Sequence, residues 1–152
     1  MAKENSRVML RRICFAGYCA LMFWLLFVRN RHPVLENYWA QMEQNVNLVP
    51  FHTIRLYLYV FRDSDLSHLI PHAIVNLAGN VVMFIPLGAF LYPEFSNRWK
   101  VLKTLLTTFV VICLVEMMQL VTLAGSCDVD DLLLNLTGSL LGCMIYCVFS
   151  KK

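Results

Sequence analysis

The sequence predicts an all-α membrane protein: a four-transmembrane-helix bundle with an interfacial or re-entrant segment in its first outer loop. Two observations carry this prediction. The chain of 152 residues is 59% hydrophobic and only 15% charged, which is too little polar surface for a water-soluble domain. Its apolar residues also fall into long blocks rather than the short periodic patches of a soluble core. A chain of this length forms one domain, so we assign 1–152 to a single unit.

Each apolar block has about the length that a bilayer requires. A helix rises about 1.5 Å per residue, so about 20 apolar residues cross a hydrocarbon layer of about 30 Å. A signal peptide is the alternative for the first block, but no small-residue cleavage pattern follows it, and we expect an anchor with little other role. The predicted helices cover about 13–28, 70–92, 101–124 and 132–149.

Basic residues predict the orientation of these helices. With the N-terminus in the cytoplasm, nine of the 13 Lys and Arg residues lie inside, and the other four lie on the loop 29–69. We therefore expect both termini in the cytoplasm.

A net charge of +3 does not favour a nucleic-acid partner. Five of the six cysteines lie in apolar blocks, with only Cys127 expected to be accessible, and no ligand set for zinc is complete, so we expect no metal and no cofactor.

The loop 29–69 contains a segment that can lie on a membrane. Residues 54–62 are mostly aliphatic or aromatic, and Arg55, Tyr59 and Arg62 recur on one side at helical spacing. We expect an interfacial or re-entrant helix here. A strand-like loop segment is the alternative, because short apolar runs do not distinguish the two.

Polar side chains inside the predicted helices form stripes, because residues three or four apart share one face of a helix. A polar group in lipid is costly, so such residues are expected to face a bundle interior or a wet cavity. At ~1.5 Å per residue, the amides and one carboxylate lie about 9 to 15 Å from the outer surface. We therefore predict an outward-facing pocket. Its candidate ligand-binding residues are Asn76, Asn80, Glu116, Gln119, Asp128, Asp131, Asn135, Arg55 and His72.

Glu116 is the strongest of these candidates, because a carboxylate at that depth must be paired, solvated or protonated. The neighbouring amide of Gln119 cannot neutralise it. A cation is expected from Arg55, Arg62 or His72, or from a ligand. We therefore predict a functional role for Glu116.

Structural roles are the alternative for the other members. Asp128 has the position of an N-cap at the start of the last predicted helix. The asparagines are alternatively hydrogen-bonding links between helices, with Gly79, Gly138 and Gly142 allowing close approach. Such links are compatible with a ligand site.

Taken in order, these residues resemble the VanZ-like family over about 47–142. The resemblance implies a multi-pass protein of the bacterial plasma membrane, in a family associated with resistance to glycopeptide antibiotics, teicoplanin in particular. The middle carboxylate, Asp130, is less typical than Asp128 and Asp131, so we rank it last of the three. The matching segments are 47–51 (NLVPF), 76–80 (NLAGN), 84–88 (FIPLG), Glu116 with Gln119, and 128–131 (DVDD) continuing to Asn135 and Gly138.

Three functions are compatible with this pattern. In the first, the pocket engages a lipid-linked envelope component or the lipid-bearing antibiotic, with membrane lipids as neighbours. In the second, an intramembrane enzyme modifies a lipid carrier through Glu116 and Asp131. In the third, the chain is a subunit of a larger transport or assembly complex, or a homo-oligomer. We favour a binding module over an enzyme, because the helices contain no obvious nucleophile or arginine pair for a phosphate.

Overall fold

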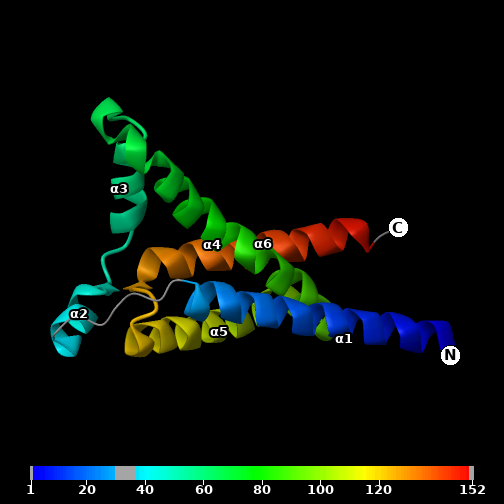
Figure 1. Ribbon diagram of the computed structural model, residues 1–152. Coiled ribbons are helices and arrows are strands. Elements are labelled where there is room, and N and C mark those ends of the chain that lie inside the picture. The colour runs from blue at the N-terminus through cyan, green and yellow to red at the C-terminus, as the bar shows by residue number, and fades with distance from the viewer. Residues whose placement is uncertain (1, 30–36, 151–152) are drawn as a thin grey trace.

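The computed structural model describes residues 2–29 and 37–150 and contains four helices that are long and apolar enough to cross a membrane. This confirms the predicted fold class. Helix α1 begins and α6 ends at one end of the bundle, called here the terminal end, and the opposite end is called the loop end (Figure 1). The long helices are α1 (Ala2–Phe23), extended by the π-helix η1 (Trp24–Val28), α4 (Ile70–Leu91), α5 (Lys100–Thr122) and α6 (Val129–Phe149).

Two of these helices, α1 and α6, begin three or more residues before the apolar blocks from which they were predicted. Helix α1 starts at Ala2, so its first turns carry polar side chains ahead of the apolar run. Helix α6 starts at Val129, because the Asp128 side chain accepts a hydrogen bond from the backbone N–H of Asp130 and thereby caps the first turn. Hydrophobicity locates the part of a helix that lies in lipid, whereas the cap determines where the helix begins.

Helices α4 and α6 pack against each other through glycines. A Cβ atom added at Gly88, Gly138 or Gly142 would overlap backbone atoms of the facing helix. Small residues allow this close approach, which maximises van der Waals contact where lipid supplies no hydrophobic driving force. The structural alternative gave Gly79 the same role, but a Cβ there would meet no described atom within 4 Å. That alternative is therefore wrong for Gly79.

Helix α5 packs beside this pair. Phe84, Leu87 and Ile112 form the buried apolar core between α4 and α5. The hydroxyls of Thr108 and Ser139 share a buried hydrogen bond of 2.9 Å, which links α5 to α6.

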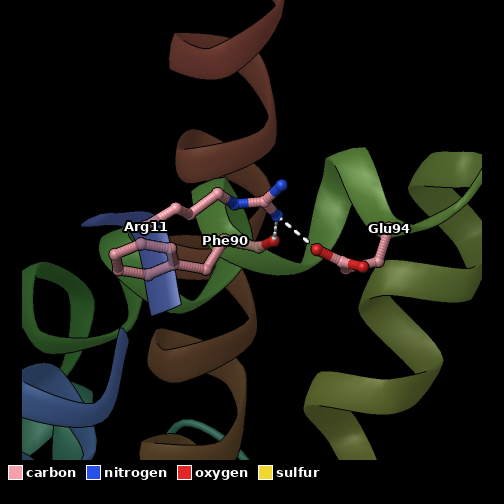
Figure 2. Close-up of polar contacts among 3 residues, drawn as sticks. All are labelled: Arg11, Phe90 and Glu94. Carbon is pink, nitrogen blue, oxygen red and sulfur yellow. Dashed lines mark hydrogen bonds and ion pairs between the residues drawn. The ribbon is translucent and has the colours of Figure 1, made fainter. Parts of the chain in front are cut away.

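Helix α1 is attached by both apolar and polar contacts: Phe15, Tyr18 and Met22 pack against the core, and two side chains form hydrogen bonds to the region of α4. Arg11 Nη2 donates hydrogen bonds of 2.6 Å to the carbonyl oxygen of Phe90 and to Glu94 Oε1, and both contacts are drawn in Figure 2. Further along α1, the Tyr18 hydroxyl donates to the carbonyl oxygen of Met83 at 2.9 Å. No side chain between 8 and 23 is buried, so α1 lies on the surface of the other three helices.

Short elements cover the loop end, and a 3-10 turn, η3 (Tyr92–Glu94), follows α4 at the terminal end. Helix α3 is helical from His52 to Val60, so the strand-like alternative for this segment was wrong. Strands β1 and β2 pair in parallel, with Val46 opposite Cys127. The loop-end elements are α2 (Tyr38–Gln44), β1 (Val46–Asn47), α3 (His52–Val60), the 3-10 helix η2 (Ser64–Leu69) and β2 (Cys127–Asp128).

Candidate functional site

A cavity of about 520 Å³ lies in the loop-end half of the bundle, between η1, α4, α5 and α6. Most of the predicted polar residues line this loop-end cavity, because the 3.6-residue period of each helix turns its polar stripe toward the same space. Apolar walls come from residues such as Leu25, Met83 and Val115. The predicted residues that line the cavity are His72, Asn76, Asn80, Glu116, Gln119, Asp131 and Asn135.

Two predicted residues do not line the loop-end cavity. Arg55 is exposed on α3. Asp128 is buried and, as the capping alternative anticipated, its Oδ1 accepts the N–H of Asp130 at 2.8 Å. Its Oδ2 accepts hydrogen bonds from Asn47 Nδ2 at 3.1 Å and from the Thr53 hydroxyl at 2.5 Å. Asp128 therefore attaches the first loop to α6.

Few protein donors reach the polar groups of the cavity. Asn80 Nδ2 donates to Asp131 Oδ1 at 2.5 Å and thereby links α4 to α6. Glu116 Oε2 accepts only a long contact of 3.4 Å from the backbone N–H of Asp128. Among the described residues, no Lys, Arg or His forms an ion pair with Glu116 or Asp131.

Two amide oxygens in the cavity are buried and accept no hydrogen bond from the described residues. Neither Asn76 Oδ1 nor Asn135 Oδ1 has a hydrogen-bond donor in the described part of the chain. Asn135 is only 4% exposed. An unpaired buried acceptor costs about 1–3 kcal/mol, so hydrogen bonds between helices do not by themselves explain these two oxygens. The cavity offers acceptors for which the described chain supplies no donors.

The first transmembrane helix contributes more than an anchor. The η1 residues Leu25 and Leu26, together with Arg29, line the loop-end cavity. Gln119 Nε2 donates to the carbonyl oxygen of Leu26 at 3.2 Å. Apolar side chains in a spanning helix give no sequence signal for such a role, and π-helical turns, which often occur at functional sites, have no recognisable pattern.

Tyr57 of α3 is another cavity residue that the sequence did not identify. Its hydroxyl lies 3.4 Å from His72 Nδ1, and the two rings are 5.9 Å apart between centroids. Burial and the nearby charges of Asp131 and Asp128 raise the pKa of Tyr57. Helix α3 therefore reaches the mouth of the cavity through Tyr57 rather than through Arg55.

Asp130, ranked last from the sequence, is the most buried of the three carboxylates. It is fully buried, and its Oδ2 accepts the backbone N–H of Ile54 at 3.1 Å. Its other oxygen accepts the N–H of Phe51, the N-cap residue of α3. A side chain from α6 thus satisfies donors at the start of α3, which an α-helix leaves without internal partners.

Cys127, expected to be an accessible thiol, is partly buried in β2. Its backbone N–H donates to the carbonyl oxygen of Asn45 at 2.7 Å. Burial, followed by the charge of Glu116, raises the pKa of the Cys127 thiol. Within 2–29 and 37–150, no three His, Cys, Asp or Glu residues are grouped to hold a metal ion.

Comparison with known proteins identifies the family. A family model described as VanZ/LLP1 matches residues 15–150, which is nearly the whole chain and includes all the cavity residues named above. No curated protein and no solved structure matches the chain. Since the family model covers α4, α5 and α6 completely, the chain belongs to the VanZ/LLP1 family.

Proposed function

We propose that this protein binds the polar head of a lipid-anchored molecule in the loop-end cavity, and thereby contributes to resistance to glycopeptide antibiotics of the teicoplanin type. The occupant is either a lipid-linked envelope component or the lipid-bearing drug. One observation carries the proposal: the cavity contains buried acceptors, Asn76 Oδ1 and Asn135 Oδ1, that have no donor within the described chain. Resistance itself comes from the family resemblance.

The cavity suits the head of an amphiphile. Apolar walls with a few polar groups are typical of small-molecule sites, which measure about 300–1,000 Å³. A cavity of about 520 Å³ accommodates a sugar, a short peptide or an amine head, while the rest of a larger molecule stays outside. The site lies among helices suited to a bilayer, so an apolar tail remains in lipid while the head is bound.

We place the loop end on the outside of a bacterial plasma membrane and both termini in the cytoplasm. The basis is the distribution of basic residues, which favour the cytoplasmic side. At the terminal end of the described chain are Arg11, Arg12, Arg98, Lys100 and Lys103, and at the loop end are Arg29, Arg55 and Arg62. In this orientation the loop-end cavity is open to envelope components outside the cell.

Protection of a teicoplanin-susceptible bacterium tests the proposal. Cells expressing the wild type should tolerate more teicoplanin than cells with an empty vector. Asn135→Ala removes a cavity amide and should abolish this protection. Asn97→Ala, in the exposed loop before α5, is the matched control and should protect fully. Full protection by Asn135→Ala, at equal abundance in the membrane, would rule out the cavity as the working site.

An intramembrane enzyme is the second candidate, because carboxylates from two helices, Glu116 and Asp131, line the same cavity. Such a pair is suited to general acid and base chemistry on a lipid carrier. Purified protein incubated with a polyprenyl phosphate, with and without Mg²⁺, tests this reading by mass spectrometry. Turnover that Glu116→Gln abolishes would support it, and no turnover by the wild type would count against it.

A further inference from the structure

We infer that the molecule recognised by the loop-end cavity carries a primary ammonium group. This inference rests on the proposed function, since it names the chemistry of the head group that the same cavity binds. Two independent features of the cavity support it: amide oxygens that receive no hydrogen bond from the described residues, and carboxylates that form no ion pair with them.

The hydrogen-bonding capacity of the cavity requires a donor. Asn76 Oδ1 and Asn135 Oδ1 are buried and receive no hydrogen bond from the described residues. They come from α4 and α6 and line the same space. A primary ammonium carries three N–H donors and no acceptor, so it adds donors without adding another group that needs one.

The two carboxylates of the cavity favour a cation. Glu116 is buried and accepts one long backbone contact, and Asp131 accepts one hydrogen bond from Asn80. No ion pair joins either carboxylate to another described residue. The basic groups that line the cavity, Arg29 and His72, are both exposed. A buried carboxylate needs an opposite charge or a proton, and a ligand ammonium supplies the charge at that depth.

Other head groups fit less well. A phosphate or carboxylate would bring a like charge next to Glu116 and Asp131. A sugar would supply donors but would not neutralise the carboxylates. A quaternary ammonium has no N–H, and its usual site is a cage of several aromatic rings, whereas the six-membered rings that line this cavity are those of Tyr57 and Phe84. A primary ammonium satisfies both requirements.

Site-resolved photolabelling tests this chemistry. The probes are three alkyl chains with the same diazirine, ending in a primary amine, a trimethylammonium or a hydroxyl group, added to the full chain in phosphatidylcholine nanodiscs. Labelled residues are mapped by mass spectrometry, which separates cavity labelling from labelling of the lipid-facing surface. We expect the amine to label η1, α4, α5 and α6 at the cavity about tenfold more than the other probes. Unlabelled hexylamine, but not hexanol, should compete with it.

Variants that neutralise the cavity carboxylates provide a second test of the ammonium inference, with the same probes. Glu116→Gln and Asp131→Asn should each reduce amine labelling of the cavity about tenfold. Asp65→Asn removes an exposed carboxylate outside the cavity and should leave labelling unchanged. Equal labelling by amine and alcohol, unaffected by either cavity variant or by hexylamine, would overturn the ammonium inference and leave head-group binding intact. If no probe labels the cavity, the proposed function itself fails.

Discussion

Asp130 Oδ1 accepts a hydrogen bond of 2.5 Å from the backbone N–H of Phe51. Phe51 has a left-handed backbone with φ of 62°, which is uncommon outside glycine, and it precedes the first turn of α3. The same carboxylate accepts the N–H of Ile54. Asp130 therefore anchors α3 directly to the first turn of α6, next to the cavity residue Asp131.

Asp130→Asn should loosen this attachment. The amide has only one acceptor oxygen, and its NH₂ group would face a backbone N–H, so one of the two charge-assisted hydrogen bonds is lost. We expect the free energy of unfolding to fall by about 2 kcal/mol. A lower Tm in nanodiscs and faster proteolysis between 46 and 63 would show this loss. Asp65→Asn, on the exposed surface of η2, is the control; equal Tm and cleavage rates for both variants would contradict the anchoring role.

The α4–α6 contact predicts opposite outcomes for two glycine substitutions. A Cβ at Gly142 would overlap the carbonyl oxygen of Ile85 and the backbone nitrogen of Ala89. Gly142→Ala must therefore push the helices apart, and we expect at least about 2 kcal/mol of destabilisation. Gly79→Ala meets no described atom within 4 Å and should leave the Tm unchanged. A Gly142→Ala protein that unfolds at the wild-type temperature would show that the two helices do not pack this closely.

The sequence predicted the helices and most of the polar side chains that line the cavity for one reason. Periodicity is local, so the spacing of Asn76 and Asn80, or of Glu116 and Gln119, already determines which residues share a face. Polar faces in lipid must turn inward. The residues predicted in this way line one cavity in the structure. Their prediction did not require the conformation of the loops.

The remaining features depend on contacts between distant parts of the chain. Asp130 and Phe51 are 79 positions apart, and nothing local indicates that one caps the helix that follows the other. Gly79 and Gly142 look alike in sequence, and only the rotation of α4 and α6 decides which one meets a backbone. Tyr57 replaces Arg55 at the cavity for the same reason, because the orientation of α3 depends on its anchor.

Cys127 should react slowly with thiol reagents at neutral pH. Burial and the charge of Glu116 raise the pKa of its thiol, and a raised pKa leaves less of the reactive thiolate. The rate of labelling by iodoacetamide should therefore still rise above pH 9, where an unperturbed thiol with a pKa of about 8.5 is already mostly ionised. Mass spectrometry assigns the label to Cys127 among the six cysteines.

Glu116→Gln tests whether the charge of Glu116 contributes to the raised pKa of the Cys127 thiol. Removing the charge should lower the pKa of the Cys127 thiol and speed its labelling at pH 9. Asp65→Asn, whose carboxylate is not among the charges that raise this pKa, should not change the rate. Identical rates for the wild type and Glu116→Gln would mean that Glu116 carries no charge in the free protein, which would weaken the case for a cationic ligand.

Arg11 contacts both Glu94 and the carbonyl oxygen of Phe90 at the terminal end (Figure 2). We expect the loss of Arg11 to lower the Tm more than the loss of the Glu94 charge alone. The ion pair with Glu94 has side chains that are 39% and 64% exposed, and such pairs contribute about 1 kcal/mol or less. Glu94→Gln should therefore change the Tm very little. Arg11→Met also removes the donor to the carbonyl oxygen of Phe90, which lies in the last turn of α4, where carbonyl groups have no partner within the helix. We expect Arg11→Met to lower the Tm more than Glu94→Gln or the exposed control Arg12→Met, and equal Tm values for all three would show that Arg11 does not hold α1 to the bundle.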